Sequence, residues 1–286
     1  MLGPADLVLC SGTLPRHTSF VDRLAAASAA GFAGISLWGR DYTAARAEGH
    51  TDTDMRTLLH DHGLAVAELD PAWWWLPGAR EIGASLAGPA DTEDVFAYDE
   101  ADLFRIADVL GARSLNAVDV FGGDWDLDAA AEAFAGVCER AGEHGLLVHL
   151  EFLPWSRVPD VNTAWEIARR AGRANGGIAV DAWHFERSAS TLDDLAAVPR
   201  DRVLGIQLDD GPAAPEADLV AATLHHRRLP GDGDFDLVAL CDTLAGSPAP
   251  VGVEVFSDEL QALGPAEAAR RAAATTRAVL ARAADR

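Results

Sequence analysis

Short apolar runs alternate along this chain with longer amphipathic segments. Runs of four to six mostly apolar residues, several of them β-branched, predict buried strands at 7–10, 34–38, 64–69, 113–118, 146–151, 178–181, 203–207 and 251–254. Between these runs, apolar residues recur every three or four positions, and glycine often follows the last of them. This periodicity predicts helices at 20–30, 52–62, 99–110, 127–143, 162–171, 192–198, 234–244 and 265–284.

Strand and helix therefore alternate eight times in 286 residues. Alternating βα units indicate a parallel sheet, and eight of them in this length indicate an α/β fold of the (β/α)8 TIM barrel type. No linker or shift in composition divides the chain, so residues 1–286 are predicted to form a single domain. A doubly wound open sheet is the alternative, but the first βα turn lacks its GxGxxG fingerprint.

One long segment interrupts the pattern. Residues 70–98 contain three consecutive tryptophans, Trp73, Trp74 and Trp75, together with several Pro and Gly residues. This composition predicts an irregular connection, and a loop of that length inside a compact domain is either functional or disordered.

Four consecutive predicted strands end in a residue that offers an oxygen atom: Glu151, Asp181, Gln207 and Glu254. In a (β/α)8 barrel the active site lies at the carboxyl ends of the strands, so these four side chains are predicted to converge on one divalent cation. Three carboxylates and an amide carbonyl suit Mn²⁺ or Mg²⁺, and Co²⁺ is compatible. A tight zinc site is less favoured, because no thiolate and no His is among the four. Each residue alone also has a structural interpretation, such as a helix cap at Asp181 or a salt bridge at Glu151.

Charge and cysteine usage limit the partners and the cell compartment. The chain has 23 basic and 45 acidic residues, a formal charge of −22, which argues against nucleic acid or an anionic membrane as partner. Cys10, Cys138 and Cys241 are far apart and form no CxxC pair, so neither a zinc knuckle nor a disulfide framework is indicated; Cys10 and Cys138 are predicted to be buried thiols. No leader pattern and no apolar run of membrane-spanning length is seen, so a cytoplasmic location is expected.

The strand-end motifs resemble those of the xylose-isomerase-like TIM-barrel superfamily, which includes sugar isomerases, ketose 3-epimerases and inosose-processing enzymes. The matching stretches are Leu150-Glu151-Phe152, Val180-Asp181-Ala182-Trp183-His184, Ile206-Gln207-Leu208-Asp209, Val253-Glu254 and Pro230-Gly231-Asp232-Gly233-Asp234. The similarity covers the chain from about the fourth strand onward and is only architectural before it. The resemblance implies one bound metal ion, proton transfer by Glu151 and Glu254, and a substrate contact by His184. Family barrels often pair, so a homo-oligomer is compatible with the resemblance.

The chain departs from many of these epimerases at one ligand position. They have His where Gln207 stands and an Arg a few residues later, whereas the sixth residue after Gln207 is Ala213. A Gln ligand followed by a His-Arg-rich loop, here residues 225–228, is more similar to the 3-dehydroshikimate dehydratases of the superfamily. Arg228 is predicted to clamp a substrate carboxylate or phosphate in this interpretation. The alternative is a solvated basic cluster on an acidic protein.

Aromatic residues also gather at the predicted strand ends. Trp38, Trp73 and Trp183 are predicted to line the substrate pocket, with Trp155 at the same face and Asp209 as a further substrate contact. Core packing is the alternative role for one or two of these tryptophans. Such a pocket suits a small-molecule sugar or a cyclic polyol or keto compound.

These residues predict an enzyme that works through an enediolate. A metal that chelates a carbonyl and a neighbouring hydroxyl acidifies the adjacent C–H, and carboxylates on either side can remove and return the proton. The simplest prediction is a sugar isomerase or epimerase. A dehydratase of the 3-dehydroshikimate or inosose type is the first alternative, and a catalytically silent ligand-binding barrel or subunit is the second. The DNA-repair endonucleases that share this barrel fit poorly, because their multi-metal site needs more His ligands.

Overall fold

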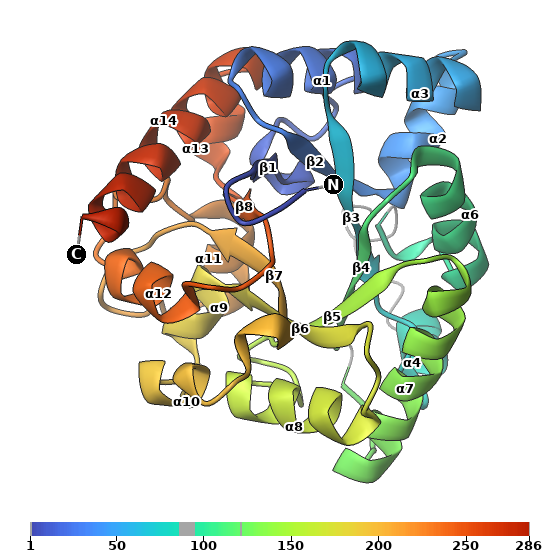
Figure 1. Cartoon of the computed structure of the whole chain (residues 1–286), viewed down its shortest axis with the longest axis vertical. Helices are drawn as coiled ribbons and strands as arrows, with labels where there is room; N and C mark the ends of the chain where they lie inside the picture. Colours follow the sequence, from blue (N-terminus) through green and yellow to red (C-terminus); the bar gives the residue numbers. More distant parts are fainter. Residues whose placement is uncertain (1, 86–94, 121, 286) are drawn as a thin grey trace.

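Eight parallel strands close into a barrel in chain order, from β1 to β8 (Figure 1). The structure is a computed structural model that describes residues 2–85, 95–120 and 122–285. The strands are β1 Leu7–Leu9, β2 Gly34–Trp38, β3 Ala65–Ala72, β4 Ser114–Val118, β5 Leu147–Glu151, β6 Gly176–Asp181, β7 Val203–Leu208 and β8 Val251–Val253. Each of these strands overlaps one that the apolar runs predict, so the (β/α)8 prediction is confirmed.

The ring closes through β1. Leu9 pairs with Ile35 of β2 on one side and with Val253 of β8 on the other, both in parallel. The backbone of β6 at Gly177 comes very close to Arg202, the residue before β7, so that a Cβ atom would collide with the carbonyl oxygen of Arg202. Glycine is therefore required at this position by close approach of two chain segments.

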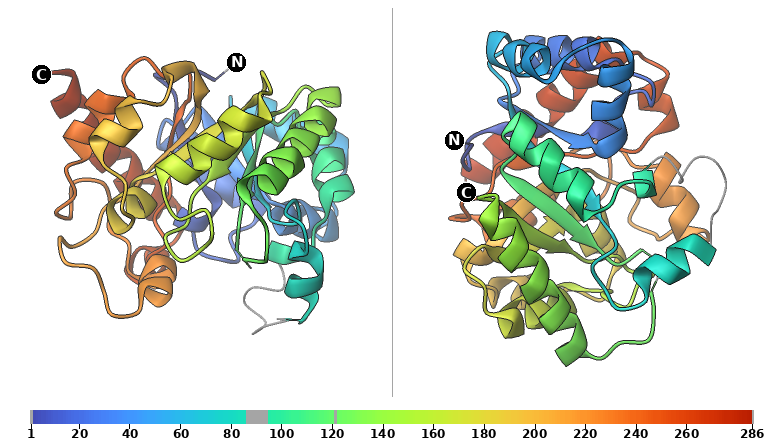
Figure 2. Two further views of the ribbon diagram at one scale, coloured as in Figure 1. Left: turned by 90° about the horizontal axis from the view of Figure 1, so that it is seen from below. Right: turned by 90° about the vertical axis from the view of Figure 1, so that its right-hand side faces the viewer.

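Helices cover the outside of the barrel (Figures 1 and 2). They are α1 Phe20–Ala29, α2 Gly39–Ala47, α3 Asp52–Asp61, α4 Ala79–Ser85, α6 Glu100–Leu110, α7 Leu127–Glu143, α8 Val161–Ala171, α9 Ala182–Arg187, α10 Leu192–Ala196, α11 Leu219–His225, α12 Leu237–Leu244, α13 Asp258–Gln261 and α14 Pro265–Ala284. The last helix, α14, packs against α1 and α12. Among the described residues, none of the helices combines the length and the apolar character that crossing a membrane would require.

Besides α4, four short helices that the periodicity did not predict lie in the connections that follow strands: α2, α9, α11 and α13. Their four to nine residues contain too few apolar positions to produce a periodic signal. Three of them are instead specified by side-chain caps, in which Asp181, Asp218 and Ser257 accept hydrogen bonds from backbone N–H groups.

The prediction of an irregular segment over residues 70–98 was wrong in part. Strand β3 continues to Ala72, because the side chains of 71 and 72 remain buried in the barrel wall, and α4 forms at Ala79–Ser85. Residues 86–94 of this segment lie outside the described residues.

Candidate metal centre

All four predicted ligands lie at the same end of the barrel on neighbouring strands. Glu151 ends β5, Asp181 ends β6, Gln207 is the penultimate residue of β7, and Glu254 directly follows β8. Asp181 and Gln207 are direct partners in the β6–β7 register. All four side chains are buried. The parallel register thus places these polar groups in the interior, at the carboxyl ends of the strands.

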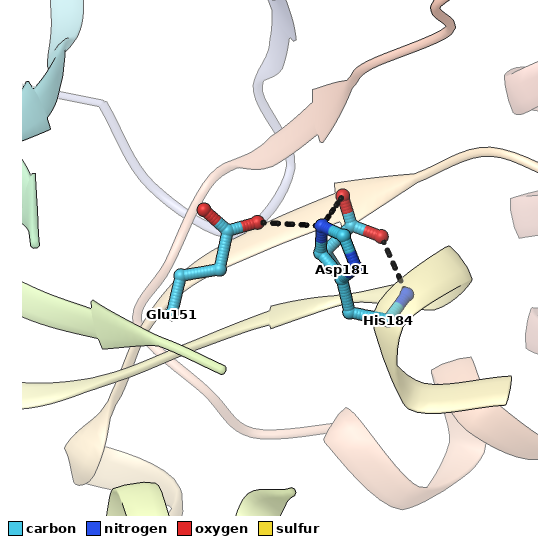
Figure 3. Close-up of side chains that lie close together, drawn as sticks. All are labelled: Glu151, Asp181 and His184. Carbon is cyan, nitrogen blue, oxygen red and sulfur yellow. Dashed lines mark hydrogen bonds and ion pairs between the residues drawn. The ribbon is translucent and has the colours of Figure 1, made fainter. Parts of the chain in front are cut away.

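The tightest cluster joins two of these residues to His184 (Figure 3). One ligand atom from each of Glu151, Asp181 and His184 lies within 4.8 Å of the others. His184 Nε2 is 3.6 Å from Glu151 Oε1 and 4.0 Å from Asp181 Oδ2. Asp181 Oδ1 accepts the backbone N–H of His184 at 3.1 Å and so caps α9. Asp181 therefore serves as a helix cap with one oxygen and faces the cluster with the other.

A buried arginine that sequence reasoning missed completes the site. Arg227 Nη1 donates to Asp181 Oδ2 at 2.7 Å and to Asp209 Oδ2 at 2.6 Å, and it lies 3.7 Å from Glu254 Oε2. The predicted residue, Arg228, is exposed. The backbone N–H of Arg227 donates to the carbonyl oxygen of Phe256, whereas the backbone of Arg228 pairs with that of Asp210. The segment is therefore extended. Adjacent side chains then point to opposite sides, and only the first enters the site.

Burial and crowding of carboxylates dominate the electrostatics. Burial raises the pKa of Glu151 well above its ordinary value, and the nearby Asp181 and Glu254 raise it further. Burial likewise raises the pKa of Glu254, although the Arg227 guanidinium opposes the shift. Burial also opposes the ionised form of Asp181, but Arg227 and His184 lower its pKa below the ordinary value. Burial lowers the pKa of His184 to about 4, so its imidazole is neutral at pH 7.

The donor set fits a divalent metal ion. Glu151 Oε1, Gln207 Oε1 and Asp209 Oδ1 are buried oxygen atoms without a hydrogen-bond partner. Leaving such oxygens without a partner is unfavourable, and a cation bound at the cluster would satisfy Glu151 Oε1. Gln207 directs its amide nitrogen at Glu68 Oε1, 3.4 Å away, which leaves Oε1 for other partners. Because neutral His184 joins the cluster, an imidazole nitrogen is available beside the oxygens, and the sequence argument against zinc loses its basis.

The predicted tryptophans differ in their surroundings. Trp183 is fully buried and donates from Nε1 to Thr223 Oγ1 at 2.7 Å, and its contact with a substrate stays a prediction. Trp38 is buried and donates to Asp70 Oδ2 at 2.9 Å, while Trp73 is partly buried. Trp155 is 37% exposed, and its ring lies edge-on to the imidazole of His184 with centroids 5.3 Å apart. Trp155 thus combines exposure with a ring contact to His184 of the cluster.

A second layer of polar side chains lies in the barrel interior beside the cluster, and sequence reasoning missed it. It comprises Glu68 and Asp70 of β3, Asn116 of β4 and His149 of β5. Burial and the neighbouring Glu68 raise the pKa of Asp70 to about 7. The signal that could have revealed this layer is the spacing of polar residues two apart within otherwise apolar strands, 68 with 70 and 149 with 151.

Comparisons with known proteins agree with this architecture. Residues 24–279 match the xylose isomerase-like TIM barrel family. The chain is 30% identical over 269 residues to a 3-dehydroshikimate dehydratase of Pseudomonas aeruginosa, covering 89% of this chain and 38% of that protein. It is 32% identical over 142 residues to an inosose isomerase of Halalkalibacterium halodurans, covering 48% of this chain and 49% of that protein. The aligned part thus spans less than half the length of each of these relatives.

A solved structure also shares the fold. The crystal structure of the IOLI protein with a bound zinc atom superimposes with a TM-score of 0.82 at 20% identity, covering 97% of this chain and 98% of that one. The closed eight-stranded barrel and the match over residues 24–279 lead to one conclusion: this chain belongs to the xylose isomerase-like TIM barrel family.

Proposed function

We propose that this protein is a divalent-metal-dependent dehydratase that acts on a small cyclic polyhydroxy ketone bearing a carboxylate. The observation that carries the proposal is the buried cluster of Glu151, Asp181 and His184, in which Glu151 Oε1 has no hydrogen-bond partner. Such a site can hold a cation and also supplies a carboxylate of raised pKa beside it. Groups with these properties suit removal of a proton from carbon.

Glu151, Asp181, Gln207 and Glu254 would hold the metal, with the neutral His184 beside them. When bound, a divalent metal polarises a substrate carbonyl and acidifies the adjacent C–H bond. Either Glu151 or Glu254 can accept that proton, because burial makes their carboxylates better bases than free ones. In dehydration, the electron pair of the broken C–H bond forms a C=C bond and the hydroxyl on the next carbon leaves. A protonated carboxyl group donates its proton to the leaving hydroxyl, and water is released.

Two observations favour dehydration over isomerisation. The relative named as a dehydratase aligns with 89% of this chain, and the one named as an isomerase aligns with 48%. The Nη2 group of the buried Arg227 lies 3.4 Å from His184 Nε2 and is the part of the guanidinium that Asp181, Asp209 and Thr223 leave unused, so a substrate carboxylate could accept a hydrogen bond from it. Neutral free sugars carry no group that needs such a cation.

An isomerase or epimerase remains the second candidate, because the same proton abstraction starts both reactions. The isomerase or epimerase reaction differs only in its last step, in which the carboxyl group returns the proton to carbon. The partial alignment with the inosose isomerase supports this candidate.

Proton NMR in D₂O distinguishes the two reactions. The purified protein with Mg²⁺ would be given 3-dehydroshikimate, inososes and free ketoses separately, with an EDTA-treated control. The expected result is metal-dependent loss of 3-dehydroshikimate and growth of signals from a dehydrated, aromatic product. Deuterium entry next to a carbonyl with the substrate retained would instead establish the isomerase or epimerase. If metal-loaded protein changes no compound in the panel, the proposal of enzymatic activity on these substrates is overturned.

A further inference from the structure

We propose that Asn116 is a positioning residue that gives the two oxygens of Glu151 different tasks, anchoring Oε2 and leaving Oε1 to face the site. This inference rests on the proposed function. Asn116 lies in β4 and its side chain is buried. Its Nδ2 donates to Glu151 Oε2 at 2.6 Å and to Asp70 Oδ1 at 3.1 Å. One amide nitrogen, with two hydrogens, thus serves two carboxylates.

The orientation of this amide is fixed by the two carboxyl groups that it faces. If the amide turned over, Oδ1 would face the oxygens of Glu151 and Asp70, which is a repulsive arrangement. The side chain therefore has a single favourable orientation, in which Oδ1 lies 3.1 Å from His149 Nδ1.

His149 is held in turn by neighbours on β3 and β4. Its Nε2 lies 3.0 Å from Glu68 Oε2 and 3.2 Å from Ser114 Oγ. Asn116 and His149 are direct partners in the β4–β5 register. The contacts therefore run from Glu68 through His149 and Asn116 to Glu151, built on three adjacent strands whose spacing the barrel fixes.

The consequence for Glu151 is an asymmetric carboxylate. Oε2 is bound by Asn116, whereas Oε1 has no hydrogen-bond partner and lies 3.6 Å from His184 Nε2. Rotation of the carboxylate by half a turn exchanges two equivalent oxygens, so in either position one oxygen accepts from Asn116 and the other faces the site. Partners of metal-binding side chains commonly act in this way, and their loss typically lowers metal affinity or activity by about 10- to 100-fold.

The test compares Asn116→Ala with a matched control, Asn175→Ala. Asn175 Nδ2 also donates two hydrogen bonds, to the carbonyl oxygens of Cys138 at 2.7 Å and Leu146 at 3.0 Å, away from the cluster. Both variants should unfold at lower temperature. Only Asn116→Ala should weaken Mn²⁺ binding in calorimetry, by roughly 10- to 100-fold, and lower kcat much more than it changes KM at saturating metal. Wild-type affinity for Mn²⁺ in folded Asn116→Ala, within about twofold, would overturn the inference.

A measurement on the wild-type protein covers the case in which the variant does not fold. In ¹⁵N-labelled protein, Mg²⁺ should shift the side-chain amide signals of Asn116 and leave those of Asn175 unchanged. If metal binds and the Asn116 signals stay in place, the positioning role is wrong while the proposed function stands. If wild-type protein binds neither Mn²⁺ nor Mg²⁺, the proposed function fails and the inference fails with it.

Discussion

Arg227 donates to Asp181 across 46 positions of sequence, with Nη1 2.7 Å from Oδ2. The same nitrogen holds Asp209, so one buried guanidinium compensates carboxylates from the ends of two strands. Removing one partner of a buried ion pair leaves uncompensated charge in the interior. In metal-free protein, Arg227→Ala should therefore lower the free energy of unfolding by about 3–5 kcal/mol.

The control for this variant is its neighbour. Arg228 is exposed, and Arg228→Ala should change the free energy of unfolding by no more than about 0.5 kcal/mol. Urea titrations of both variants, with and without Mn²⁺, measure the difference. Added Mn²⁺ should restore part of the stability of Arg227→Ala, because the bound metal ion replaces the positive charge of the lost guanidinium. Equal losses in the two variants would contradict the assignment of Arg227 to the site.

Removal of metal should lower thermal stability. A ligand that binds only the folded state adds about 2.7 kcal/mol at a concentration of 100 times its Kd. Wild-type protein treated with EDTA should therefore melt at lower temperature than protein given Mn²⁺, as followed by calorimetry. Glu151→Gln should lose most of this Mn²⁺-dependent shift. A shift of wild-type size in that variant would argue against Glu151 as a ligand.

Glu254 should be required for proton transfer. Glu254→Gln keeps the shape of the side chain and removes its basic oxygen, so kcat should fall by about 10²- to 10⁴-fold. Substrate binding, measured by calorimetry, should change far less. Glu259→Gln provides the control, since Glu259 is an exposed carboxylate on the following helix α13. A wild-type kcat in Glu254→Gln would show that Glu254 is not required for proton transfer.

Gly177 should not tolerate a larger side chain. Its Cβ would collide with the backbone of Arg202 and the side chain of Leu204, so Gly177→Ala should lower stability by about 1–3 kcal/mol. Gly142 is exposed within helix α7, where a Cβ meets nothing closer than 3.5 Å. Gly142→Ala should instead raise stability by about 0.5–1 kcal/mol. Chemical denaturation of both variants gives the comparison, and a stable Gly177→Ala would show that Arg202 and Leu204 can move aside.

The cysteines should react slowly in the folded protein. Cys10 and Cys138 are buried, as predicted. Burial raises the pKa of Cys138 to about 12 and that of Cys241 to about 11, which lowers the fraction of reactive thiolate at pH 8. Alkylation by iodoacetamide at pH 8, followed by mass spectrometry, should thus be much slower without urea than with it. Rapid labelling of Cys138 in native protein would contradict its burial.

The local pattern of the sequence determined the barrel and the positions of its strand-end residues. Apolar runs and helical periodicity are properties of neighbouring residues, so eight βα units and their order could be predicted without knowledge of distant contacts. Glu151, Asp181, Gln207 and Glu254 followed from the same logic, because each lies at the end of a strand that the pattern defines. The resemblance to a known family added the expected ligand roles.

Tertiary structure decided which groups meet at the site. Arg227 rather than Arg228 enters it because of backbone pairing with residues 210 and 256, far away in sequence. Trp183 meets Thr223, and Asn116 reaches Glu151, only because the closed barrel and its connections bring these segments together. Such contacts depend on the relative placement of segments separated by tens of residues, and local residue patterns carry no information about that placement.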